Sequence, residues 1–194
     1  MPVRYPRGQT HGFLVLRDLE NKILATRDLS QFVNGDRVTS EFVMNFKDGS
    51  LHQETTVFSQ RSRFEVLTCH LVQKGPSFKR ASDTSLNIST GEVITRSTDE
   101  HGKEKASTEK IKMPSDVANG LLNTVLSDTD PKAPKTTLSM VVATPKPRIV
   151  KLEITSLGED SYSIAGSRRK AVQHQGKHWR NRRSNRTDHR KATA

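Results

Sequence analysis

Apolar and polar residues alternate along most of the chain, in short runs that are separated by turn residues. Alternation with a period of two is typical of β-strands, because neighbouring side chains of a strand point to opposite faces. Asn34-Gly35 and Asp48-Gly49 separate such runs, and both pairs favour tight hairpins because these residue types tolerate a positive φ. The pattern predicts a meander of antiparallel strands. The expected strands are 11–17, 23–33, 38–46, 51–60, 64–72, 85–88, 92–97, 138–143, 149–155 and 162–165.

One segment, 114–127, departs from this alternation and places apolar residues at helical spacing. Ser115 is a suitable N-cap and Asp116 is favourable in a first turn, whereas Gly120 weakens a helix by about 1 kcal/mol relative to alanine. We therefore predict a mainly β fold. It consists of a curved antiparallel sheet, similar to a half-barrel, with one amphipathic helix near 114–127.

The apolar side of this predicted helix must cover one face of the sheet. If it covers only part of that face, the remainder forms an apolar groove of the kind that binds lipids or other apolar ligands. A filled core without a cavity is equally compatible with the sequence. The helix residues expected to line such a groove are Val117, Leu121, Leu122 and Val125.

Charge divides the 194-residue chain into two parts. The formal net charge is +11, but 168–194 contains ten Lys or Arg and one acidic residue, so 1–167 carries only +2. We therefore predict one β-rich domain over 1–167, truncated at its end, and a basic disordered tail over 168–194. No run of about 18 apolar residues is present for a membrane span. The polar segment 1–10 lacks the apolar core of a signal peptide, so the chain as written is expected in the cytoplasm.

The basic tail has two interpretations. As a working segment, it would bind the phosphate backbone of a nucleic acid through its arginines while an aromatic ring stacks on bases. The residues of that hypothesis are Trp179, Arg180, Arg182, Arg183 and Arg186. Alternatively, the tail is the product of a frameshift. If codons take the last two bases of one residue and the first base of the next, 172–179 can encode Tyr-Asn-Ile-Lys-Val-Asn-Ile-Gly, an alternating strand. We favour the frameshift over nucleic-acid binding.

Residues with catalytic or metal-binding chemistry are scattered along the chain. Cys69 is the only cysteine and is adjacent to His70, but neighbours in a strand point to opposite faces, so Cys69 is expected in the core. No glycine-rich phosphate loop, nucleophile elbow or metal-ligand spacing is present. The sequence thus indicates no catalytic, cofactor-binding or metal site. The other histidines and glutamates that we considered for such roles are His11, His52, His101, Glu41, Glu54 and Glu65.

Seven segments of the chain carry a resemblance to a known family. They are HGFLVLR (11–17), GDRVTS (35–40), FKDGS (46–50), ETTVFSQ (54–60), HLVQKGP (70–76), PSDVANG (114–120) and TPKPR (144–148). Through them the chain, from about 3 to 171, resembles a family of uncharacterised exported bacterial proteins. The resemblance implies a signal peptide before Val3 and, after Ala171, a Tyr-x-Ile/Val-Lys-Val-x-Ile-Gly-Gly strand that the shifted frame reproduces. It implies no activity, and the family is similar to half-barrel periplasmic lipoprotein carriers only in general fold.

These inferences lead to one expected function and two alternatives. We expect a non-enzymatic extracytoplasmic protein without a cofactor, which binds an apolar ligand or a cell-envelope component in a groove between the sheet and the helix. Nucleic-acid binding through the arginine-rich tail is the first alternative. A hydrolase whose site is not visible in the sequence is the second.

Overall fold

The computed structural model of the protein describes residues 2–98, 102–130, 133, 135–144, 146–164 and 167–179. It is 63% strand and 4% helix, which confirms the predicted mainly β fold with one helix. The strands form a sheet of eight and a sheet of three, and they do not close into a barrel. In the part of the chain described, the helical structure falls short of the length and hydrophobicity that crossing a membrane requires.

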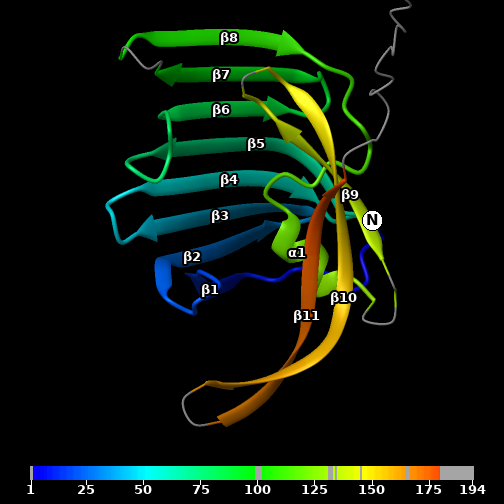
Figure 1. The fold of residues 1–194 in the computed structure, drawn as a ribbon. Helices are drawn as coiled ribbons and strands as arrows, with labels where there is room; N and C mark the ends of the chain where they lie inside the picture. Colours follow the sequence, from blue (N-terminus) through cyan, green and yellow to red (C-terminus); the bar gives the residue numbers. More distant parts are fainter. Residues whose placement is uncertain are drawn as a thin grey trace, which may run out of the picture.

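The larger sheet is an antiparallel meander, in which each strand pairs with the next strand along the chain (Figure 1). Its strands are β1 (Thr10–Arg17), β2 (Ile23–Asn34), β3 (Arg37–Phe46), β4 (Leu51–Ser59), β5 (Glu65–Lys74), β6 (Ser82–Asn87), β7 (Glu92–Thr98) and β8 (Glu104–Lys110). Gly35 and Gly49 adopt positive φ angles of 61° and 85° in the two predicted turns. β8 was not predicted, because its EKASTEK sequence has no apolar alternation; main-chain pairing with β7 forms this strand.

The smaller sheet has the antiparallel strand order β11-β10-β9. It comprises β9 (Thr136–Val142), β10 (Arg148–Ile164) and β11 (Ser167–Trp179). The long β10–β11 hairpin extends past the β1 edge of the larger sheet (Figure 1). β10 is continuous where two strands were predicted, because Gly158, with a φ of 98°, forms a bulge instead of a turn.

Part of the predicted disordered tail forms a strand, since 168–179 belongs to β11. The side chains of β11 that the structure describes are mostly exposed, so apolar alternation does not explain this strand. Main-chain pairing with β10 does, together with opposite charges across the hairpin: Lys177 faces Glu153, and Lys170 Nζ lies 3.1 Å from Glu159 Oε2. Of the residues assigned to nucleic-acid binding, Trp179 ends β11, and Arg180, Arg182, Arg183 and Arg186 lie outside the described residues.

The helix, α1 (Leu122–Asp128), begins later than the predicted 114–127. The preceding residues are not helical, and Val117 instead forms a parallel β-bridge with Ser139 of β9. Gly120 has a φ of 68°, which is a left-handed conformation that a right-handed helix does not contain. The helix therefore starts only after Gly120, and Ser115 is not its N-cap.

The hydrophobic core lies between α1, the smaller sheet and one face of the larger sheet. We call this the inner face and its opposite the outer face. The inner face and the elements covering it bury a continuous apolar cluster. Its buried members include Val38, Phe58, Cys69, Leu86 and Val93 of the larger sheet, with Val117, Leu121, Val125, Leu138, Val141 and Ile154 from the covering elements.

Candidate functional site

A pocket lies between α1, the segment before it and β9. Its volume is about 200 Å³. The lining residues are Phe64, Asp116, Val117, Ala118, Leu121, Val125, Thr136, Thr137 and Leu138. Three of the four residues predicted to line a groove are among them. The fourth, Leu122, is partly buried against the hydrophobic core but does not line this pocket.

Asn119 fixes the segment that forms one wall of this pocket. Its side-chain amide donates a hydrogen bond of 3.0 Å to the carbonyl of Val141 and accepts one of 2.8 Å from the Val141 N–H. A side-chain amide thus takes the place of a neighbouring strand at β9. Because Asn119 and Val141 are buried, these bonds satisfy main-chain groups that water does not reach.

Asp116, Ser139 and Lys151 form a polar trio beside the pocket. The Ser139 hydroxyl donates to Asp116 Oδ1 at 2.6 Å, and Lys151 Nζ donates to Asp116 Oδ2 at 2.8 Å and to Ser139 Oγ at 2.6 Å. Burial raises the pKa of Asp116, but the hydrogen bonds from Lys151 and Ser139 outweigh it and hold that pKa below its ordinary value.

This trio does not have the properties of a hydrolase site. A serine nucleophile must be accessible and needs a neutral base, whereas Ser139 is fully buried and Lys151 is ion-paired with the carboxylate of Asp116. Its evident effect is to fasten the segment before α1 to β9 and β10.

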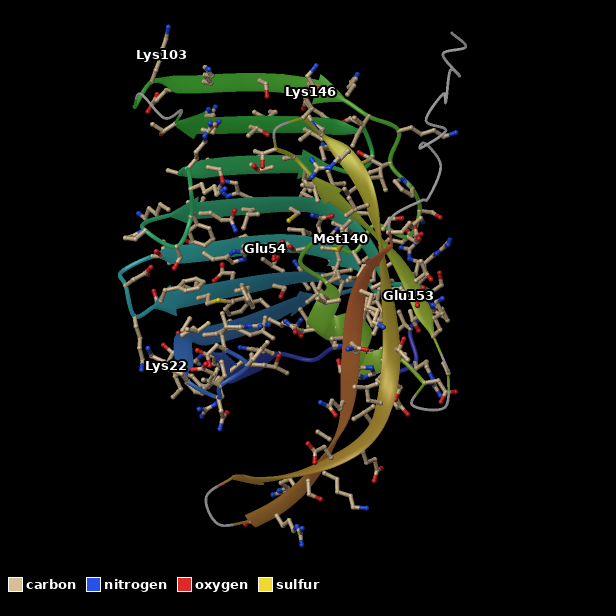
Figure 2. All side chains as sticks on the ribbon, in the orientation of Figure 1. Lys22, Glu54, Lys103, Met140, Lys146 and Glu153 are labelled. Atoms are coloured by element: carbon tan, nitrogen blue, oxygen red, sulfur yellow. The ribbon has the colours of Figure 1, made fainter. Side chains whose placement is uncertain are left out.

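A second group of side chains lies on the larger sheet, and we call it the Arg27 cluster. It consists of Arg27 on β2, Phe42 on β3, and His52 and Glu54 on β4. Phe42 is directly opposite Glu54, and Arg27 is directly opposite Met44, two residues from Phe42. Residues that face each other or lie two apart share a face, so the whole cluster is on one side of the sheet. Figure 2 shows Glu54 on β4, near the middle of the larger sheet.

That side is the inner face. Gln31, four residues after Arg27 on β2, donates a hydrogen bond of 3.2 Å from Nε2 to the Thr124 hydroxyl of α1. Likewise Thr56, two residues after Glu54, lies directly beneath Gly120. The Arg27 cluster therefore lies on the same face as the core. It occupies the parts of β2 and β4 that precede the contacts of Gln31 and Thr56.

Aromatic contacts join the members of the cluster. The guanidinium carbon of Arg27 lies 3.8 Å from the centroid of the Phe42 ring, a close cation–π contact. Phe42 meets His52 edge-on, with 5.4 Å between centroids, and Gln73 Nε2 is 3.0 Å from His52 Nδ1. The ring of Phe78, from the loop after β5, also lies beside His52, with 6.5 Å between the two ring centroids.

Burial controls the electrostatics of the cluster. It raises the pKa of Glu54 above its ordinary value, although a hydrogen bond from Cys69 and the charge of Arg27 act in the opposite direction. Burial also lowers the pKa of Arg27 to about 10, against the influence of Glu54. The pKa of His52 is lowered as well, first by burial and then by the charge of Arg27.

The guanidinium of Arg27 is only partly satisfied. Its Nε and Nη2 atoms are buried and have no hydrogen-bond partner among the described residues. Glu54, the acid opposite Phe42, accepts its hydrogen bond from the Cys69 thiol instead, at 3.2 Å.

Cys69 and His70 point to opposite faces, as the alternation predicts. Cys69 is buried on the inner face, where burial and the neighbouring Glu54 raise the pKa of its thiol far above the ordinary value. Such a thiol is a poor nucleophile. His70 is exposed on the outer face, with Nε2 2.9 Å from Asp83 Oδ1.

Of the other candidate acids and histidines, those that the structure describes are not brought together. Glu41 and Glu65 are exposed, and His11 is exposed beside Asp28, at 3.8 Å. His101 lies outside the described residues. In the part of the chain that the structure describes, no group of three or more His, Cys, Asp or Glu is arranged to hold a metal ion.

Sequence reasoning named three pocket residues but did not find the Arg27 cluster. It weighed Glu54 and His52 only as acid, base or metal candidates and did not consider Arg27 or Phe42. A signal was present in the alternation: Arg27 occupies an inward position between Ala25 and Leu29. A charged residue at an inward strand position is costly to bury and is therefore informative.

Comparisons with protein-family models, with curated proteins and with solved structures found no match for this chain.

Proposed function

We propose that this protein is a non-enzymatic binding protein, which holds the apolar part of a ligand in the pocket between α1 and β9. The observation that carries the proposal is the lining of this pocket. Six of its residues are apolar and fully or largely buried: Phe64, Val117, Ala118, Leu121, Val125 and Leu138. Polar groups are confined to Asp116, Thr136 and Thr137. A mostly apolar lining with a few polar groups is typical of ligand pockets.

The size of the pocket limits what it can hold. Its volume of about 200 Å³ is above that of an engineered apolar cavity of ~150 Å³ that binds benzene, and below the ~300 Å³ at which pockets for drug-sized ligands begin. A short alkyl segment or one ring fits this volume. The pocket would therefore hold one end of a lipid rather than a whole lipid.

An extracytoplasmic setting and a cell-envelope ligand are part of the same proposal. They are supported by the resemblance of residues 3–171 to exported bacterial proteins. The absence of an enzymatic role from the proposal rests on Ser139 and Cys69, because the buried serine and the buried thiol both lack the properties of a nucleophile.

The proposal can be tested with octan-1-ol as a probe, followed by NMR of backbone amides. We expect millimolar octan-1-ol to shift the amide signals of 117–125 and 136–138. Thr136→Phe, which puts a large side chain at a half-buried position of the lining, should abolish these shifts. Thr108→Phe, at an exposed position of β8, is the matched control and should leave them unchanged.

Two results would contradict the proposal. One is the absence of localised shifts in the unaltered protein. The other is a Thr136→Phe variant that keeps its melting temperature and still shows the same shifts. A melting curve of each variant separates loss of the pocket from loss of the fold.

A further inference from the structure

Arg27 presents one free edge of its guanidinium on the inner face. Nε and Nη2 carry the N–H groups of the same edge, and neither has a partner among the described residues. This edge is the planar fork that pairs with the two oxygens of a carboxylate or a phosphate. The fixed spacing of the two donors makes such pairing bidentate, so the free edge has a definite chemical complement.

Among the residues that the structure describes, no acid fills this complement. Asp28, the residue after Arg27, points to the outer face, where it lies 3.8 Å from His11. Glu54 is on the inner face, but its hydrogen bond is with Cys69. An arginine that is half-buried without a carboxylate partner reduces stability, and such groups recur at recognition sites.

Apolar residues lie beside Arg27 on the inner face of the neighbouring strands. Directly opposite Arg27 are Leu14 on β1 and Met44 on β3, and the next inward pair is Leu29 and Phe42. All four are partly exposed, and Leu14 retains 37% of its accessible surface. An anion bound here would therefore lie among apolar groups, which favours a carboxylate attached to an apolar body over a free inorganic anion.

We propose that Arg27 binds the carboxylate of an amphipathic monocarboxylate, whose apolar body lies along Leu14, Met44 and Phe42. Both donor nitrogens are shielded from solvent, so the ligand reaches them through a rotamer change of Arg27 or of a neighbouring side chain. Glu54 competes with the ligand through its negative charge. This site is separate from the pocket between α1 and β9 and does not depend on it.

The test uses sodium octanoate, with octan-1-ol as the same chain without a carboxylate and inorganic phosphate as an anion without a chain. Binding is measured by calorimetry and by the NMR signal of the Arg27 Nε–H. We expect octanoate to bind and to shift this signal, together with the amides of Arg27, Phe42 and Glu54. Octan-1-ol and phosphate should leave these signals in place.

Variants of Arg27 test separately the contribution of its two-donor geometry and that of its positive charge. Arg27→Gln should weaken octanoate binding at least tenfold, and Arg27→Lys, which keeps the charge but loses the planar fork, should weaken it severalfold. Glu54→Gln should strengthen binding, because it removes the competing charge. Arg96→Gln, at an exposed arginine of β7, is the matched control and should bind as the unaltered protein does.

Several outcomes would overturn the proposal. They are an unaltered protein that does not bind octanoate, an Arg27→Lys variant that folds and binds equally well, and a Glu54→Gln variant with weakened binding, which would show that Glu54 supports the site instead of competing with the ligand. Phosphate binding as tight as that of octanoate would refute the proposed contact between the apolar body of the ligand and the side chains around Arg27. Because the reporting signals belong to the Arg27 cluster, failure here is distinguishable from failure of the α1 pocket, whose reporters are 117–125 and 136–138.

Discussion

Glu54 places a carboxylate between two apolar neighbours on the inner face, since it is directly opposite Phe42 on β3 and Leu71 on β5. Burial raises its pKa above the ordinary value of about 4.5, so ionisation of Glu54 is less favourable in the folded protein than in the unfolded chain. A raised pKa stabilises the folded state at low pH, and that stabilisation is lost as the pH rises through the folded-state pKa.

Glu54→Gln removes the charge and should therefore reverse this loss. We expect the variant to melt at nearly the same temperature as the unaltered protein near pH 4 and at a higher temperature at pH 8. The measurement is the melting temperature of both proteins across this pH range, followed by circular dichroism.

Glu41→Gln is the control for this experiment, because Glu41 is an exposed residue of β3. Its melting temperature should differ from that of the unaltered protein by a small amount that does not grow with pH. A Glu54→Gln variant that loses stability at pH 8 relative to the unaltered protein would show that the ionised carboxylate is a net stabilising partner of Arg27.

At the scale of elements, Gly120 decides where the helix begins. Its φ is 68°, and a Cβ at this position would lie 1.8 Å from Thr56 Oγ1 and 2.7 Å from Thr56 Cβ. The segment before α1 therefore crosses β4 at a distance that only glycine permits. This close approach lets the segment reach β9, where it lines the pocket.

Gly120→Ala should be strongly destabilising. The left-handed backbone alone costs a non-glycine residue about 1–2 kcal/mol, and overpacking against Thr56 adds roughly 1–3 kcal/mol more. Gly35→Ala is the matched control, since Gly35 has a φ of 61° but nothing within 4 Å of its added Cβ. Unfolding in urea measures both costs. Equal costs for the two variants would mean that the contact with Thr56 contributes nothing.

How much of these elements the sequence could predict depends on what stabilises each one. Strands with an apolar face and an Asn-Gly or Asp-Gly turn, such as β2 to β4, were predicted nearly to their ends, because burial itself produces the alternation. β8 and β11 are formed by pairing with a neighbouring strand, and their own sequences lack the apolar alternation that would predict a strand. The helix was predicted too long, because apolar spacing does not report the close contact at Gly120.

The residues of the pocket and of the Arg27 cluster divide in the same way, into those that burial makes predictable and those that strand pairing brings together. Val117, Leu121 and Val125 could be named from sequence because apolar residues at helical spacing must be buried somewhere. Which β-strands they meet, and whether a pocket remains, depends on the smaller sheet and its register. The Arg27 cluster draws on β2, β3 and β4, and its contacts follow from strand pairing across distant parts of the chain.

At the scale of the molecule, the two edges of the larger sheet differ in composition. β8 carries charged residues along its length, such as Lys105 and Glu109, and charge on an edge strand opposes pairing with another chain. β1 has the sequence THGFLVLR, and its Phe13 and Val15 retain 78% and 50% of their accessible surface. The hydrogen-bonding groups on its free side have no adjacent strand in the described part of the sheet.

An exposed apolar edge of this kind predicts self-association through β1. Two copies paired antiparallel about Leu14 would place Phe13 of each opposite Val15 of the other, an aromatic–β-branched pair that stabilises antiparallel strands by about 0.2–1 kcal/mol. We expect the protein to associate with rising concentration in sedimentation velocity. Val15→Lys should weaken this association at least tenfold, because it places two like charges at the pairing edge.

Ala106→Lys adds the same charge to the opposite edge, at an exposed position of β8, and should leave the association unchanged. Equal effects of the two lysines would mean that net charge, not the β1 edge, governs the association. A protein that remains monomeric at every concentration would show that the free groups of β1 do not pair at all. Comparison of the two lysine variants is decisive because both add one positive charge to an edge strand, and only Val15→Lys removes apolar surface from the predicted contact.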